Sequence, residues 1–224
     1  MILPILTLLL FAAGLSAQTI AIIGDSTVCD CPTSHACRGW GQFLGDHLKE
    51  SARVINLAKS GRSTKTFIQE GLWNKTIAQK PDFILIQFGH NDSHGPGKSE
   101  STDAATSYRD FLHRYIREAR AAGVIPVLVT PMHRRTFKER WLEDILKPYA
   151  DAMKAVAMEQ RVDLVDLHTS SGKLFAKLGA EKSAEFASTP TDRTHFNERG
   201  AKAMAELVAK ELPTAEHKLK PLFR

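Results

Sequence analysis

Short apolar runs alternate with longer segments of helical periodicity along most of this chain. Five of the runs are rich in β-branched residues and show little polar alternation, which is typical of strands buried on both faces of a sheet. They predict strands over residues 20–23, 54–57, 83–88, 124–129 and 162–167. The segments between and after them predict helices over residues 40–51, 66–78, 102–121, 141–160 and about 197–211.

Regular alternation of strands and helices predicts parallel strands joined by right-handed crossovers. We therefore expect an α/β fold, a three-layer α/β/α sandwich with about five parallel strands in one domain over residues 18–224. In such sheets the ligand lies beyond the carboxyl ends of the strands. The loops that follow the predicted strands are thus the places to look for chemistry.

The first residues of the chain form a separate segment. Residues 2–13 are almost unbroken apolar sequence and are followed by small residues up to Ala17. This pattern predicts a secretory signal peptide over residues 1–17, and hence a secreted or periplasmic protein. The run is too short for a comfortable membrane span, which needs about 20 apolar residues. An uncleaved anchor and a buried first strand are the alternatives, and no later segment predicts a span.

Net charge bears on the possible partners, and the cysteines bear on a possible disulfide or metal site. The formal net charge is +5, but the Lys and Arg residues are scattered among acidic ones, so no nucleic-acid partner is predicted. Cys29, Cys31 and Cys37 lie close together in the sequence. In an exported protein a disulfide from Cys37 to Cys31 or to Cys29 is plausible. A zinc site with His35 is the less favoured alternative, because the spacing matches no usual zinc pattern.

Polar residues follow the predicted strands. Ser26 in "GDST" comes directly after the first strand, where a plain turn, a helix cap or an active-site mouth would each fit. The later strand ends and the start of the last helix carry "NLAKSGRST", "QFGHNDSHGPG", "TPMHRR" and "TPTDRTHFNERG". Several polar loops that converge at one edge of the sheet favour the active-site reading over the other two.

Asp192 and His195 are three residues apart, a spacing that one helical turn brings onto the same face. There the carboxylate would fix the imidazole tautomer and leave the other ring nitrogen as a base. That arrangement is the Asp–His half of a hydrolase triad, with Ser26 as its nucleophile. The alternative is an ordinary surface turn.

A serine nucleophile also needs hydrogen-bond donors for the oxyanion. The backbone N–H of Ser26 is one, and Gly61 offers a second that a substrate can approach closely. The side-chain amide of Asn91 offers a third, and each such donor is typically worth a factor of about 100–1,000 in rate. Taken singly, Gly61 and Asn91 would read as ordinary loop residues.

Together these blocks resemble those of the SGNH, or GDSL, hydrolases. Ser26 in "GDST", Gly61 in "GRS", Asn91 in "GHND" and His195 in "DRTH" occur in the family's order and span residues 20–200. With "GWG" at residues 39–41, the wording is most similar to that of the rhamnogalacturonan acetylesterases. The unusual segment "CDCPTSHAC" before it would reshape one rim of the cleft.

The resemblance implies a flavodoxin-like sheet and a triad of Ser26, His195 and Asp192 with no metal or other cofactor. It further implies a serine esterase that deacetylates an acetylated polysaccharide or oligosaccharide, such as rhamnogalacturonan or another pectin, and the predicted signal peptide adds that this esterase is secreted. His90 flanks Asn91 and would shape the substrate site. The residues themselves add Arg134 and Arg135, which follow the fourth strand. They would either pair with galacturonate carboxylates or form an ordinary solvated rim, which is slightly favoured.

Other functions stay open at this point. The same fold and chemistry would serve acetylxylan or lipid esters. A metal-dependent phosphoesterase is a less favoured alternative, because its D-x-H ligand motif is absent from the first strand and "DLH" occurs only at residues 166–168. A carbohydrate-binding protein with an inactive site is a third possibility.

Overall fold

The computed structural model describes residues 17–224, so all of the predicted signal peptide over residues 1–17 except Ala17 lies outside the described residues. The strands are β1 (Gln18–Gly24), β2 (Ala52–Asn56), β3 (Phe83–Gln87), β4 (Ile125–Val129), β5 (Phe137–Lys138), β6 (Trp141–Leu142) and β7 (Asp163–Val165). The α-helices are α1 (Thr64–Gln69), α2 (Leu72–Ile77), α3 (Ser107–Ala121), α4 (Lys147–Gln160), α5 (Leu167–Ala184) and α6 (Glu198–Ala215). The 3₁₀ helices are η1 (Trp40–Gln42), η2 (Leu44–His47) and η3 (His217–Leu222).

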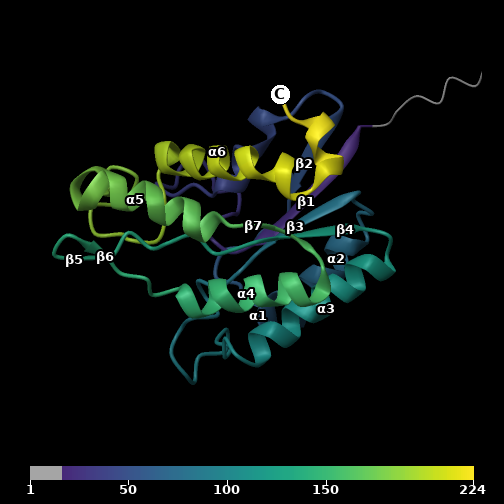
Figure 1. Ribbon diagram of the computed structural model, residues 1–224, viewed down its shortest axis with the longest axis horizontal. Helices are drawn as coiled ribbons and strands as arrows, with labels where there is room; N and C mark the ends of the chain where they lie inside the picture. The colour runs from purple at the N-terminus through teal and green to yellow at the C-terminus, as the bar shows by residue number, and fades with distance from the viewer. Residues whose placement is uncertain (1–16) are drawn as a thin grey trace, which may run out of the picture.

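The main sheet has the order β2-β1-β3-β4-β7 with every pair parallel. This confirms the five predicted strands and the α/β class. The order is that of a flavodoxin-like sheet. In such a sheet the strand order reverses direction at a switch point, which here lies between β1 and β3. β5 and β6 form a separate antiparallel hairpin that projects at one end of the molecule (Figure 1).

Helices cover both faces of the sheet (Figure 1). Alternate residues of β1 point to opposite faces, as in any strand. Ile20 and Ile22 pack with α5, α6 and η1, whereas Ala21 and Ile23 pack with α1 to α4. Since both faces are buried, all these strand residues are inaccessible to solvent. No helix among residues 17–224 is long and apolar enough to cross a membrane.

The helix predictions are correct in place but wrong in several boundaries. The predicted helix over residues 40–51 is instead two short 3₁₀ helices, η1 and η2, and Gly41 in this segment packs closely against the Val28 carbonyl. The predicted helix over residues 66–78 breaks at Gly71, which adopts a left-handed φ of 71°. The predicted helices at 102 and 141 begin later, at Ser107 and Lys147.

Helix α5 was not predicted. Its sequence is rich in Ser, Gly and Lys and lacks a clear apolar stripe, so no periodicity signals it. Asp166 caps the helix by accepting a hydrogen bond from the Thr169 N–H at 3.1 Å. Burial of Leu167 and Phe175 against the sheet then stabilises a helix that its periodicity does not reveal.

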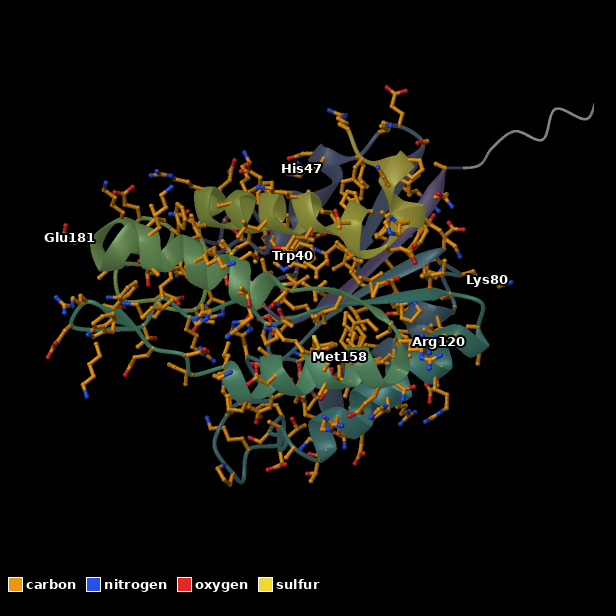
Figure 2. The ribbon with its side chains drawn as sticks, in the orientation of Figure 1. Trp40, His47, Lys80, Arg120, Met158 and Glu181 are labelled. Carbon is orange, nitrogen blue, oxygen red and sulfur yellow. The ribbon has the colours of Figure 1, made fainter. Side chains whose placement is uncertain are left out.

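Trp40 ties η1 to the end of β1. It lies in the interior between α6 and the sheet (Figure 2). Its indole N–H donates to Gln87 at 2.7 Å, and the Gln87 amide donates to the Thr27 hydroxyl at 2.9 Å. The Trp40 backbone N–H also donates to the Thr27 carbonyl at 3.0 Å. The turn after β1 is therefore held by buried hydrogen bonds from two neighbouring elements.

Gly39, next to Trp40, lies against the backbone of Val28 and Cys29 in the turn after β1. A Cβ at Gly39 would lie 2.3 Å from the Cys29 carbonyl oxygen, so one of the two backbones must move. We expect Gly39→Ala to lower the free energy of unfolding by about 1–3 kcal/mol, as overpacking does. A Cβ at Gly45 meets nothing within 4 Å, so Gly45→Ala is the matched control. Urea unfolding of both variants is the measurement, and equal midpoints would contradict the prediction.

Candidate active site

Ser26 lies at the carboxyl end of β1, at the point where the sheet reverses its winding direction. The turn that carries it is built by Asp25, whose carboxylate accepts from the Thr27 N–H at 2.9 Å and the Thr27 hydroxyl at 2.7 Å. The Asp25 carbonyl accepts from the N–H groups of Val28 and Cys29. Asp25 and Thr27 are buried while Ser26 is partly exposed, so the turn presents the Ser26 hydroxyl to solvent.

The structure brings Ser26, His195 and Asp192 into one hydrogen-bonded line. Ser26 Oγ lies 2.9 Å from His195 Nε2, although the two residues are 169 positions apart in the chain. His195 Nδ1 lies 2.8 Å from Asp192 Oδ2. A carboxylate accepts hydrogen bonds, so Nδ1 carries the ring proton and Nε2 is left to accept the proton of Ser26.

Asp192 is held as an acceptor by four donors. Its Oδ1 accepts from the backbone N–H groups of Thr194 and His195 at 2.7 and 2.8 Å. Its Oδ2 accepts from the Ser188 hydroxyl at 2.8 Å as well as from the His195 ring. Burial alone would raise the pKa of Asp192, but these hydrogen bonds outweigh it and hold the pKa at about 2. The carboxylate is therefore charged at neutral pH.

Arg135 was expected to contact substrate, but it supports the loop that carries His195. The side chain is buried and donates to the carbonyls of His195 at 2.7 Å and Asp192 at 3.4 Å. Its guanidinium also stacks over the Phe196 ring at 4.3 Å. A side chain that is 2% exposed is not available to a polymer. Arg135 is thus a positioning residue, and the expectation of a carboxylate contact is corrected.

His90 is also buried, with 2% of its surface exposed, and its Nδ1 lies 3.4 Å from the Asp25 carboxylate. The ring therefore packs behind the nucleophile turn instead of facing substrate, which corrects that expectation. Arg134 is partly exposed. It donates to the His90 carbonyl at 3.1 Å and to the Thr194 hydroxyl, and so links the Asn91 loop to the His195 loop.

The two loops expected to supply oxyanion donors are joined to each other. The Asn91 side-chain amide donates to the Arg62 carbonyl at 3.0 Å, next to Gly61, which has a left-handed φ of 79°. Buried Asp92, next to Asn91, accepts hydrogen bonds from Thr64 at the start of α1 and from Thr102. The Lys59 N–H donates to the Gly24 carbonyl at 2.9 Å, which places the Gly61 loop beside the end of β1.

A pocket of about 700 Å³ opens over Ser26 and His195. Its walls come from the nucleophile turn, the cysteine-rich segment, the Gly61 loop and the loop before α6. The lining residues are Ser26, Cys29, Asp30, Cys31, Pro32, His35, Ala36, Cys37, Lys59, Ser60, Ser188, Thr189, Asp192 and His195. This volume is within the usual range for small-molecule sites and would admit a sugar unit with a small acyl group.

The cysteine-rich segment forms one rim of this pocket. All three cysteines are free thiols, and the sulfur atoms of Cys31 and Cys37 lie 3.2 Å apart. Cys29 is buried and directs its thiol toward the Ser26 carbonyl at 3.8 Å. Of the two predicted pairings, the structure therefore places Cys31 and Cys37 together. Among residues 17–224, the cysteines do not form a metal-ligand cluster with His35.

Three residues at the site were not predicted from the sequence. Ser188 orients Asp192, Lys59 and Thr189 line the pocket, and none of the three lies in a recognisable motif position. The "NLAKSGRST" block points to Lys59 only as a member of a polar loop. Nothing in the sequence around Ser188 signals its contact, because that contact depends on how the loop before α6 folds back.

Comparisons with known proteins identify the family of this chain. A model of the GDSL-like lipase/acylhydrolase family matches residues 22–203. "Probable rhamnogalacturonan acetylesterase YesY" of Bacillus subtilis is 39% identical over 87% of this chain and 92% of its own length. "Rhamnogalacturonan acetylesterase RhgT" of the same organism is 38% identical over 88% of this chain and 93% of its own.

Solved structures share the fold. The crystal structure of YxiM from Bacillus subtilis superposes with a TM-score of 0.79 at 28% identity and covers 89% of this chain. This chain spans 57% of that longer protein. A catalytic mutant of an acetylxylan esterase from Geobacillus stearothermophilus superposes with a TM-score of 0.65 at 21% identity, a likeness in fold alone.

The depressed pKa of Asp192 predicts a pH-dependent contribution to stability. Because the folded carboxylate binds a proton more weakly than the unfolded one, it stabilises the fold above its ordinary pKa of 3.8. That contribution is lost as the pH falls from 3.8 toward about 2. We expect Asp192→Asn to be less stable than wild type at neutral pH and the difference to shrink across this window. Urea unfolding at a series of pH values measures it, and a pH-independent difference would refute the assignment.

Proposed function

This chain belongs to the GDSL-like lipase/acylhydrolase family and is a carboxylic ester hydrolase, and from that premise we propose its substrate and mechanism. The proposed enzyme is a secreted serine esterase that removes acetyl groups from rhamnogalacturonan or a related pectin. The observation that carries the mechanism is the 2.9 Å contact between Ser26 Oγ and His195 Nε2, backed by Asp192.

In the first half of the proposed reaction, His195 Nε2 takes the Ser26 proton as Oγ attacks the acetyl carbonyl carbon. The carbonyl electron pair moves onto its oxygen, and the resulting imidazolium is stabilised by Asp192. Collapse of this intermediate expels the sugar oxygen, which takes the proton back from His195. An acetyl-serine ester on Ser26 remains.

In the second half, water replaces the sugar. His195 accepts a proton from the water as its oxygen attacks the acetyl carbon, and the Ser26 oxygen then leaves with that proton. The products are acetate and the free enzyme. Protonation of His195 at low pH would block both halves, since the ring could then accept no further proton.

The oxyanion of each half would be held by three N–H donors: the backbone groups of Ser26 and Gly61, and the Asn91 amide. One Asn91 amide proton is used on the Arg62 carbonyl, which orients the amide and leaves the second proton free. The left-handed φ of Gly61 supports its role, because a side chain there would strain the backbone whose N–H is needed.

The substrate class rests on the named relatives and on the pocket. Two relatives that match along most of their length carry the name rhamnogalacturonan acetylesterase. The pocket is open and its volume of about 700 Å³ suits one sugar unit of a polymer, with Lys59 in its lining together with the carboxylates of Asp30 and Asp192. Partly exposed Arg134 lies beside the His195 loop, where it could meet a galacturonate carboxylate.

Ser26→Ala is the direct test of the mechanism. We expect kcat/KM to fall at least about 10,000-fold, because the nucleophile is removed while the fold is untouched. Ser51→Ala is the matched control, since Ser51 is an exposed serine that lies outside this pocket. Wild type should also be labelled at Ser26 by a fluorophosphonate.

Acetate release from acetylated rhamnogalacturonan, acetylated xylan and nitrophenyl esters of rising chain length provides the measurement. Full activity of Ser26→Ala, or a wild-type serine that stays unlabelled, would overturn the mechanism. Preference for acetylxylan or for long-chain esters would overturn the proposed substrate and leave the mechanism standing.

Export is the remaining element of the proposal. The apolar run over residues 2–13 and the small residues up to Ala17 support cleavage near that position. The described fold begins with β1 at Gln18, directly after it. We expect the exported protein to begin at about Gln18, which mass spectrometry of the protein purified from the medium or periplasm would show. Retention of residues 1–16 in that protein would refute cleavage.

A further inference from the structure

Two histidines and an aspartate converge in a region that the proposed reaction does not use. His133 follows β4, Asp144 precedes α4, and His168 lies in the first turn of α5. One ligand atom from each of the three lies within 4.8 Å of the other two. Both histidines are buried, while 39% of the Asp144 side chain is exposed, so the cluster has one side open to solvent.

The tautomer of His168 leaves a lone pair directed at the carboxylate. Its Nδ1 lies 2.9 Å from the Pro131 carbonyl, which accepts hydrogen bonds only, so Nδ1 carries the ring proton. The neutral ring then has an acceptor at Nε2, 2.8 Å from Asp144 Oδ1. Two acceptors at that distance need a positive charge between them, which a proton or a metal ion would supply.

His133 brings a second imidazole to the same oxygen. Its Nε2 lies 3.7 Å from Asp144 Oδ1, and its ring stacks on His168 with the centroids 4.0 Å apart. Two stacked imidazole rings this close repel each other if both are protonated. If a single proton lies between His168 and Asp144, the His133 ring is therefore left neutral and without a carboxylate partner of its own. A metal ion with a charge of +2 would satisfy both rings and the carboxylate.

The protein holds this arrangement in place. The His133 backbone N–H donates to the Ser171 hydroxyl at 3.0 Å, which docks the loop onto α5. A Cβ at Gly172 would lie 2.8 Å from His133 Nε2, so the glycine leaves the space that the ring occupies. The hydrogen bond from His168 Nδ1 to a carbonyl is the outer contact that metal-bound histidines usually make.

We propose that His133, Asp144 and His168 form a binding site for a divalent transition-metal ion, with Zn²⁺ as the best fit. Two imidazole nitrogens and one carboxylate oxygen suit zinc, and solvent on the exposed side of Asp144 would supply a fourth ligand. Tetrahedral zinc separates its ligand atoms by about 3.3–3.5 Å, between the two distances of 2.8 and 3.7 Å seen here. Binding would increase the 20° angle between the ring planes, so that both lone pairs point at one ion.

Such an ion would join the loop between β4 and α4 to α5. That loop also carries Arg134 and Arg135, whose contacts support the His195 loop. The inferred role is therefore structural: the ion would fix the position of residues 131–146. The inference stands independently of the proposed esterase mechanism.

Metal titration of the chelator-treated protein, with its natural sequence and no affinity tag, tests the site. We expect calorimetry to show one Zn²⁺ bound per chain, Co²⁺ to give the visible absorption of a low-coordinate site, and saturating Zn²⁺ to raise Tm. Asp144→Asn and His168→Gln should each weaken Zn²⁺ binding at least about tenfold. Far-UV circular dichroism checks that each variant folds, and Asp144 is exposed enough for its substitution to be tolerated.

Glu100→Gln is the matched control. Glu100 pairs with His94 at 2.6 Å on the surface but has no second histidine, so this variant should bind Zn²⁺ as wild type does. A Cys31→Ser, Cys37→Ser double variant should do the same. The absence of saturable Zn²⁺ binding to wild type would overturn the proposal and leave the cluster as a buried histidine–carboxylate pair. Binding that survives in Asp144→Asn and His168→Gln but is lost in the cysteine variant would overturn it as well.

Discussion

The contact between Ser26 and His195 sets the constraint that the rest of the structure must meet. A hydrogen bond tolerates only a few tenths of an ångström, yet these residues lie on loops 169 positions apart. Each loop is held in position by contacts of its own. The Ser26 turn is held by Asp25 and by the buried chain from Thr27 through Gln87 to Trp40. The His195 loop is held by Arg135 and Ser188.

Buried polar groups are concentrated around this site. Among residues 17–224, no group forms a hydrogen bond with two of the guanidinium nitrogens of Arg135, which is almost fully buried, or with either ring nitrogen of buried His90. Burying polar groups in this way costs stability unless other contacts offset it. Local departures of this kind are expected where geometry serves chemistry and not stability.

Several features could be predicted because they depend on short stretches of sequence. Apolar runs with β-branched residues located all five strands of the sheet, and the motif blocks located Ser26, Asp192 and His195 at one edge. Helix α5 was missed because its stability comes from packing of Leu167 and Phe175 and not from periodicity. The segment at residues 40–51 was wrongly predicted as one helix, and its Gly41 lies against the Val28 carbonyl, a contact between separate segments that no local pattern reveals.

By itself, the sequence determined the alternation of strands and helices, and with it the α/β class and the polar loops that end the strands. Those properties follow from periodicity and from residue types that are close together in the chain. Only the tertiary structure decided that His90 and Arg135 are buried supports while Lys59 and Ser188 belong to the site. It also decided that His133 and His168 share Asp144. Exposure and contact between distant residues depend on how loops pack across the sheet, and local sequence carries no record of that packing.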